Sequence, residues 1–221
     1  MAKFKKIDTL GIIRSTGIVP VFYNADVELT KKVVKACYDG GIRAFEFTNR
    51  GDGAHKVFEE LIAFVRAECP GMALGAGTIL DAPTAALYLQ MGADFLVSPC
   101  IIEEVIPLAN RRGVPYSPGC GTVTEIAHAM EKGCDLVKVF PAGTVGGPAF
   151  VKNILAPLPW AMVMATGAVE PTAENLSAWA ASGVTAVGMG SKLFPKEVLK
   201  AQDWKAVSDL CTECLAWFKK K

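Results

Sequence analysis

Lys138 stands in the short apolar run Leu136-Val137-Lys138-Val139-Phe140. The β-branched residues of this run and the flanking Gly133 and Pro141 predict a buried strand. Burial favours the neutral amine over the ammonium, so the pKa of such a lysine falls and the amine can attack a ketone to form an imine. A lysine that reaches solvent from the strand end, or that pairs with a carboxylate, needs no such chemistry. The strand by itself leaves both interpretations open.

Glu46 is a candidate proton-transfer group on another predicted strand, Ala44 to Thr48. Alternate residues of a strand point to opposite faces, and Phe45 and Phe47 suit contact with helices, so Glu46 and Thr48 take the other face. The same alternation turns Lys138 to the side opposite its valine neighbours. Two opposite charges facing one interior are costly unless they are paired or used. A structural salt bridge between Glu46 and Lys138 is therefore the alternative to an active site.

Polar residues also end several other predicted strands, which a single salt bridge does not explain. These residues are Arg50, Thr78, Ser98 and Thr166. Two further loops, Ala165-Thr166-Gly167-Ala168 and Gly188-Met189-Gly190-Ser191, are small and glycine-containing. Such loops can bind a phosphate or another anion through backbone N–H groups, although glycines in tight turns need no ligand. We predict an anion site at Gly167, Ala168, Gly190 and Ser191.

The elements that must position these residues alternate along the whole chain. Eight strands are predicted, at Ile18–Phe22, Ala44–Thr48, Leu74–Thr78, Phe95–Ser98, Val114–Ser117, Leu136–Phe140, Ala161–Thr166 and Ala186–Gly190. A helical pattern follows each strand and is most periodic at Val27–Tyr38, Ala54–Glu68 and Trp204–Lys219. Eight such units predict an α/β fold, a single (β/α)8 TIM barrel with its reactive groups at the carboxyl ends of the strands. An open doubly wound sheet is the alternative, but its G-x-G-x-x-G turn is not found.

Local signals agree with this division. Gly41, Gly92, Gly133 and Gly183 each precede two turn residues and an apolar strand, as expected for left-handed residues that end helices. Asp26 and Asp81 are predicted N-caps, and Thr122-Val123-Thr124-Glu125 is a predicted capping box.

Composition restricts the class of protein. The chain has 221 residues, 51% of them hydrophobic, and a net charge of +1, which suits one large core and a single domain over residues 1–221. This charge balance predicts no nucleic-acid partner, and the interrupted apolar stretch from Ile154 to Val169 predicts no membrane span. No apolar segment follows the basic residues near Met1, so we expect a cytoplasmic chain whose Lys219-Lys220-Lys221 tail is solvated.

The seven cysteines are an odd number scattered over predicted helices and strands, which favours reduced thiols. Cys211 and Cys214 form the one C-x-x-C pair, within a terminal helical pattern, and the only histidines are His55 and His128. A zinc or redox centre would need a second ligand pair or a redox context. We predict no metal and no cofactor.

Seven segments of the chain, in this order, resemble the KDPG/KHG aldolase family, the 2-dehydro-3-deoxy-phosphogluconate and 4-hydroxy-2-oxoglutarate aldolases. They are Ile18-Val19-Pro20-Val21, Glu46-Phe47-Thr48-Asn49-Arg50, Gly75-Ala76-Gly77-Thr78, Ser98-Pro99, Ser117-Pro118-Gly119, Lys138-Val139-Phe140-Pro141-Ala142 and Gly146-Gly147. The match extends over almost the whole chain, and the E-x-T-x-R and K-x-F-P-A pieces make it specific.

The resemblance implies a metal-free class I aldolase in which Lys138 forms a Schiff base with a small keto acid. Glu46 is then the general acid and base, and Arg50 and Thr78 hold the pyruvyl carboxylate. Pro99 and Phe140 form apolar walls, and Thr166 also lies where substrate would bind. Cleavage between C3 and C4 releases pyruvate and an aldehyde. The substrate is a 2-keto-3-deoxy sugar acid, 6-phosphorylated by preference, or 4-hydroxy-2-oxoglutarate, and the resemblance also implies a homotrimer.

Two positions depart from the family's pattern. Ala168 stands where the phosphate loop usually has a second glycine, and an alanine loses freedom at positive φ. Asn49 stands where an aliphatic residue is common, and we expect it to add a polar contact to the substrate.

Two other functions compete with the aldolase. One is a phosphate-binding barrel isomerase or synthase, in which Glu46 abstracts a proton and Lys138 is only a fixed cation without a covalent adduct. The other is a barrel that binds a sugar acid as a sensor or scaffold, without turnover. Neither the aldehyde product nor the configuration at C4 follows from the sequence.

Overall fold

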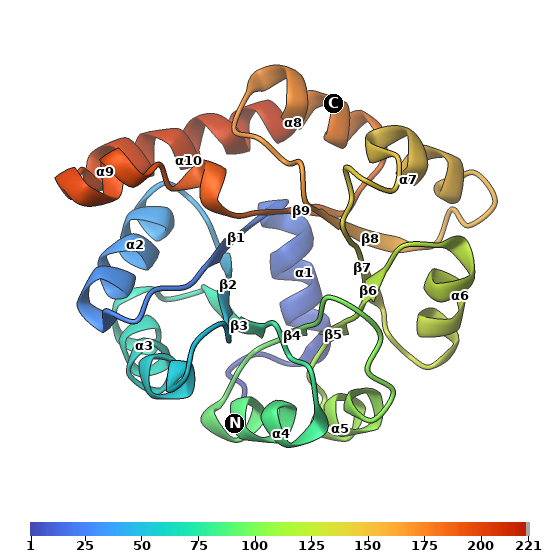
Figure 1. Cartoon of the computed structure of the whole chain (residues 1–221), viewed down its shortest axis with the longest axis horizontal. Coiled ribbons are helices and arrows are strands. Elements are labelled where there is room, and N and C mark those ends of the chain that lie inside the picture. Colours follow the sequence, from blue (N-terminus) through green and yellow to red (C-terminus); the bar gives the residue numbers. More distant parts are fainter. Residues whose placement is uncertain (220–221) are drawn as a thin grey trace.

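The computed structural model describes residues 1–219, so the last two lysines of the predicted solvated tail lie outside it. Strands and helices alternate along this part of the chain (Figure 1). The strands are β1 (Ile18–Phe22), β2 (Ala44–Thr48), β3 (Ala73–Gly77), β4 (Leu96–Val97), β5 (Tyr116–Ser117), β6 (Gly119–Cys120), β7 (Leu136–Val139), β8 (Met162–Thr166) and β9 (Ala186–Met189). The helices are α1 (Lys6–Thr16), α2 (Val27–Asp39), α3 (Ala54–Glu68), α4 (Ala82–Met91), α5 (Val105–Arg112), α6 (Val123–Glu131), α7 (Gly147–Leu155), α8 (Ala173–Ala181), the 3-10 turn η1 (Ser191–Leu193), α9 (Lys196–Ala201) and α10 (Trp204–Lys219).

The sheet closes on itself. Within residues 1–219 its strand order is β5-β4-β3-β2-β1-β9-β8-β7-β6, and every pair is parallel. The two edge strands, β5 and β6, are the two halves of one segment interrupted by Pro118, which has no N–H to donate. Counted as one, they give the eight strands of a single (β/α)8 barrel, and the open doubly wound alternative is wrong.

Side chains of the strands divide between two cores, as their alternation predicts. Phe45, Phe47, Val137 and Val139 pack with the surrounding helices in the larger hydrophobic cluster. Leu136 packs in a smaller interior cluster with the strand residues Val19, Ala44, Ala73, Val97, Met164 and Ala186 and with Phe95, which directly precedes β4. The predicted inward direction of Glu46 and Lys138 is therefore confirmed, since each alternates with outward neighbours.

Helix α1 closes the amino-terminal end of the barrel, which the sequence patterns had not identified as helical. It leads through Gly17, at φ 72°, directly into β1, and its Ile13 joins the interior cluster. The Thr16 hydroxyl accepts a hydrogen bond from the Arg43 backbone N–H at 3.1 Å, just before β2. In Figure 1, α1 lies across the centre of the barrel. The opposite, carboxyl-terminal end of the strands is the end left for a ligand.

The predicted local signals are confirmed. Asp26 and Asp81 accept hydrogen bonds from the first turns of α2 and α4, and Thr122 and Glu125 form the capping box of α6. The four helix-ending glycines are left-handed, with φ between 91° and 100°, and are Gly41, Gly92, Gly133 and Gly183. Strand β5 is shorter than predicted because Pro115 cannot donate to the ladder, and β3 ends one residue earlier than predicted because Thr78 leaves the extended conformation.

None of the helices in residues 1–219 is both long and apolar enough to cross a membrane. The cysteines are Cys37, Cys69, Cys100, Cys120, Cys134, Cys211 and Cys214, and all are free thiols.

Candidate active site

Lys138 lies inside the barrel on β7, between Gly119 of β6 and Met164 of β8. Its side chain is only 6% exposed. Burial lowers the pKa of the Lys138 amine, the positive charge of Arg50 lowers it further, and the negative charge of Glu46 opposes both. Lys138 Nζ lies 4.7 Å from the centre of the Phe140 ring. Burial therefore shifts Lys138 toward the neutral, nucleophilic amine, while the face of the Phe140 ring and the charge of Glu46 favour the ammonium.

Glu46 lies inside the barrel on β2 and is 1% exposed. Its Oε2 has no hydrogen-bond partner among residues 1–219. Burial raises the pKa of the Glu46 carboxyl, and the charges of Lys138 and Arg50 act in the opposite direction. A Cβ built on Gly77 of neighbouring β3 would lie 1.8 Å from Glu46 Oε1. Glycine at position 77 therefore provides the space that the carboxyl group occupies.

The predicted alternative of a structural salt bridge is not what the structure contains. In the described part of the chain, no ion pair within 4 Å joins Lys138 to Glu46. Two buried ionisable groups without direct partners destabilise a fold. Such a pair inside a barrel mouth is typical of a functional site, where perturbed pKa values serve proton transfer.

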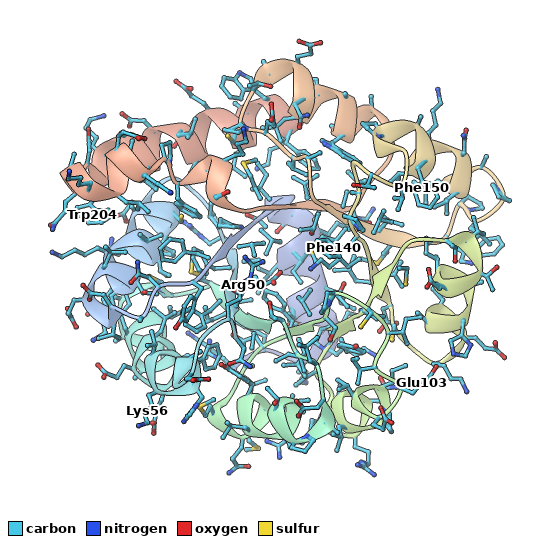
Figure 2. All side chains as sticks on the ribbon, viewed as in Figure 1. Arg50, Lys56, Glu103, Phe140, Phe150 and Trp204 are labelled. Carbon is cyan, nitrogen blue, oxygen red and sulfur yellow. The ribbon has the colours of Figure 1, made fainter. Side chains whose placement is uncertain are left out.

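Arg50 and Thr78 lie just beyond the ends of β2 and β3. Figure 2 shows Arg50 and Phe140 toward the centre of the barrel, whereas Lys56, Glu103, Phe150 and Trp204 lie around its outside. Thr78 has a φ of 60°, a left-handed conformation that costs a non-glycine residue on the order of 1 kcal/mol. Strain of this kind often occurs at functional sites.

The expectation that Asn49 contacts substrate stays a prediction, and the structure gives this side chain another partner. Asn49 points outward from β2, and its Oδ1 accepts a hydrogen bond from the Tyr88 hydroxyl at 3.0 Å. Tyr88 is buried on α4, where its ring packs edge-on against Phe58 with centres 4.9 Å apart. Asn49 therefore ties the segment that carries Arg50 to the helix layer behind the sheet.

A cavity of about 350 Å³ opens at the carboxyl ends of β8 and β9. Its lining brings together Arg50, Phe140 and Thr166 with all four predicted anion-binding residues, Gly167, Ala168, Gly190 and Ser191. The Thr166 hydroxyl oxygen is buried and has no hydrogen-bond partner among the described residues. Pro99 lies elsewhere on the rim, after β4, with its carbonyl oxygen 2.1 Å from a Cβ built on Gly119.

The loop after β8 keeps the shape that a second glycine would allow. Gly167 has a φ of 101° and Ala168 a φ of 58°, so the alanine takes the left-handed conformation despite its cost. Asn175, in the first turn of α8, holds the loop at two points. Its Nδ2 donates to the Ala168 carbonyl at 3.3 Å, and its Oδ1 accepts from the Glu170 backbone N–H at 2.9 Å.

Sequence reasoning missed two charged residues of this cavity, Glu170 and Lys192. Lys192 directly follows the predicted anion-binding residue Ser191, and that adjacency was the available signal. Larger hollows of about 590 and 570 Å³ lie elsewhere, one beside Trp204 between α2, α3 and α10, the other beside Trp160 near the amino-terminal end of the barrel. Neither is lined by a predicted site residue, so the barrel mouth remains the candidate active site.

Comparison with known proteins agrees with this geometry. The model of the family described as KDPG and KHG aldolase matches residues 10–210. The chain belongs to this family. It is 35% identical to a 2-dehydro-3-deoxy-phosphogluconate aldolase of Pseudomonas aeruginosa, over 98% of this chain and 94% of that protein. It is 30% identical to the KHG/KDPG aldolase of Escherichia coli K12, over 95% of this chain and 96% of the relative.

A solved structure adds chemical detail. The KDPG aldolase of Legionella pneumophila, with pyruvate captured as a covalent carbinolamine intermediate, superposes with a TM-score of 0.82 at 26% identity, covering 92% of this chain and 96% of that one. A carbinolamine is the adduct that precedes an imine between an amine and a ketone. The family is thus one in which a covalent pyruvate adduct has been observed.

Proposed function

We propose that this protein is a pyruvate-forming class I aldolase, a lyase that cleaves 2-keto-3-deoxy-6-phosphogluconate, 4-hydroxy-2-oxoglutarate or both. The observation that carries the proposal is the buried amine of Lys138, which forms no ion pair within residues 1–219, in the same barrel interior as Glu46, whose Oε2 has no hydrogen-bond partner among those residues. The family membership supports the same chemistry.

The proposed reaction begins at Lys138. Its neutral amine attacks the C2 ketone of the substrate to give a carbinolamine. Glu46 donates a proton to the carbinolamine hydroxyl, which leaves as water, so that an iminium ion and the Glu46 carboxylate remain. Glu46 removes the proton of the C4 hydroxyl, the C3–C4 bond breaks, and its electrons move into the iminium to give an enamine. The aldehyde leaves, Glu46 returns a proton to C3, and water hydrolyses the imine to release pyruvate and the free lysine. No metal, and no organic cofactor, takes part in this sequence.

The remaining site residues receive binding roles in the proposal. Arg50 and Thr78 hold the carboxylate of the pyruvyl half, while Pro99 and Phe140 enclose the imine. Thr166, whose hydroxyl is buried and unpartnered, donates to the bound substrate. The backbone N–H groups of Gly167, Ala168, Gly190 and Ser191 bind the distal phosphate.

Preference for a phosphorylated substrate is supported by the left-handed conformation of Ala168, because the loop retains its shape without a second glycine. The distal phosphate then contributes binding energy at a point remote from the breaking bond, which raises kcat/KM for the cleavage.

The test is a cleavage assay that follows pyruvate release from each of the two substrates in wild type and in Lys138→Arg and Glu46→Gln. The proposal predicts cleavage by wild type, none by Lys138→Arg and strongly reduced cleavage by Glu46→Gln. Isomerisation or condensation without pyruvate release would support the noncovalent alternative, and binding without turnover would support the sensor. The aldolase relatives favour neither of these alternatives.

We also propose that residues 1–221 act as one domain, in a homotrimer located in the cytoplasm. The trimer rests on the family resemblance, and the seven free thiols suit a reducing compartment. Sedimentation equilibrium tests the trimer, with a dimer or monomer mass contradicting it. Cell fractionation tests the location.

A further inference from the structure

Two residues of the cavity lining form an ion pair. Lys192 Nζ, on η1 after β9, is 3.6 Å from Glu170 Oε1, in the loop after β8. Their side chains are 67% and 48% exposed, respectively. Exposed pairs of this kind contribute at most about 1 kcal/mol, because water and salt screen them. A stronger partner for the ammonium can therefore displace Glu170 at little cost.

The two members of this pair are not held equally. The Glu170 backbone N–H donates to Asn175 Oδ1 at 2.9 Å, so the residue is fixed to α8. Lys192 carries the longer and more exposed side chain, and within residues 1–219 its one carboxylate neighbour closer than 4 Å is Glu170. The ammonium is the member that can change partners.

Charged side chains of both signs line the cavity. The charged residues of the lining are Arg50, Glu170 and Lys192. Arg50 is assigned to the pyruvyl carboxylate in the proposed function, which leaves the oppositely charged Lys192 and Glu170. These two residues line the same cavity as Ser191 and Ala168 and lie within two residues of them in the chain. An anion bound to the backbone N–H groups of Ser191 and Ala168 comes within reach of Lys192 and near the repelling Glu170.

We propose that Lys192 is a specificity-determining residue, which exchanges Glu170 for the distal anion of the substrate. Glu170 acts against it, because its negative charge competes for Lys192 and repels the same anion. The inference rests on the proposed function and adds to it two opposed side chains outside the backbone anion loops. A distal phosphate monoester, with two negative charges, gains more from Lys192 than a neutral hydroxyl does.

The test compares kcat/KM for a 6-phosphorylated 2-keto-3-deoxy sugar acid with that for its unphosphorylated form, at low ionic strength. Lys192→Gln should lower the ratio of the two values about tenfold, the loss of one charge-assisted contact. Glu170→Gln should raise the ratio about threefold. The matched controls Lys196→Gln and Glu174→Gln change the net charge identically at exposed positions outside the cavity, and should leave the ratio within twofold of wild type.

Opposite shifts in Lys192→Gln and Glu170→Gln support the inference, since a merely structural ion pair would give shifts of the same direction and a loss of thermal stability in both. An unchanged ratio in Lys192→Gln, or an equal shift in Lys196→Gln, would overturn the inference alone. Wild type that cleaves neither substrate and traps no pyruvate under borohydride would overturn the proposed function, and this inference with it.

Discussion

Gly77→Ala should displace the Glu46 carboxyl and lower kcat by more than its effect on the stability of the barrel explains. The new Cβ would lie 1.8 Å from Glu46 Oε1 and 2.5 Å from its Cδ. Real Cβ atoms are essentially never found closer than 3.0 Å to another heavy atom, so the carboxyl must move away by about 1.2 Å. A displacement of about 1 Å in a catalytic group costs on the order of 10²-fold in rate, so we expect kcat for cleavage to fall by this factor.

A matched control lies two residues away on the same strand. Gly75 also faces the barrel interior, and a Cβ there would lie 2.3 Å from the Phe95 ring, in the cluster next to α1. Both variants overpack the interior, at a typical cost of about 1–3 kcal/mol in unfolding free energy. Only Gly77→Ala should lose most of its kcat.

The assay is steady-state pyruvate release, with thermal unfolding measured on both variants. Gly77→Ala that is folded yet within threefold of the wild-type kcat would refute the assignment of Glu46. An equal loss of kcat in Gly75→Ala would show that general distortion of the barrel explains the result.

Three further predictions concern the chemistry and the anion loop. Glu46→Gln should still trap pyruvate slowly, but its cleavage rate should fall on the order of 10²-fold or more. Near wild-type cleavage by this variant would assign the proton transfer to another group. Lys138→Arg should fold yet trap no pyruvate, because a guanidinium stays protonated. The rate of imine formation at saturating pyruvate should rise with pH and level off below 10.5, the ordinary lysine pKa, since burial lowers the pKa of Lys138. Arg50→Ala removes a positive charge that also lowers the pKa of Lys138, so the pH range over which the rate of imine formation rises should move to higher pH in this variant. An unchanged pH range would contradict the electrostatic account. Ala168→Gly should change kcat/KM for the phosphorylated substrate, relative to kcat/KM for 4-hydroxy-2-oxoglutarate, by less than about threefold. The reason is that Ala168 is already left-handed, at φ 58°. A larger change would show that the Ala168 methyl group shapes the cavity.

The sequence predicted the barrel and the direction of its central side chains because both follow from the short repeats of apolar residues within single strands and helices. Alternation on β2 and β7 was enough to turn Glu46 and Lys138 inward, since side chains of a strand point to opposite faces in turn. The residue type of Ala168 argues against a left-handed conformation in the loop after β8, yet Ala168 adopts that conformation. Hydrogen bonds from Asn175 to the Ala168 carbonyl and from the Glu170 N–H to Asn175 help to hold the loop, and Asn175 lies on a different element, α8.

Features that depend on contacts between distant segments could not be predicted. The position of Asn49 beside Arg50 favours a contact with substrate, and nothing near it in the sequence predicts that it accepts a hydrogen bond from Tyr88, 39 residues further along the chain. Helix α1 was missed because it lies across one end of the barrel, and its apolar residues do not form the regular stripe of a helix that covers the outer face of a sheet. The contact of Glu46 with Gly77 joins two strands, and no local pattern encodes it.

Covalent trapping at Lys138 tests the central claim most directly. The wild-type protein is incubated with pyruvate and borohydride, digested, and its peptides are measured by mass spectrometry. We expect loss of activity and one reduced pyruvyl group on the peptide that contains Lys138, with no such adduct in Lys138→Arg. An adduct on a different lysine, or no adduct under conditions in which the protein releases pyruvate, would contradict the account.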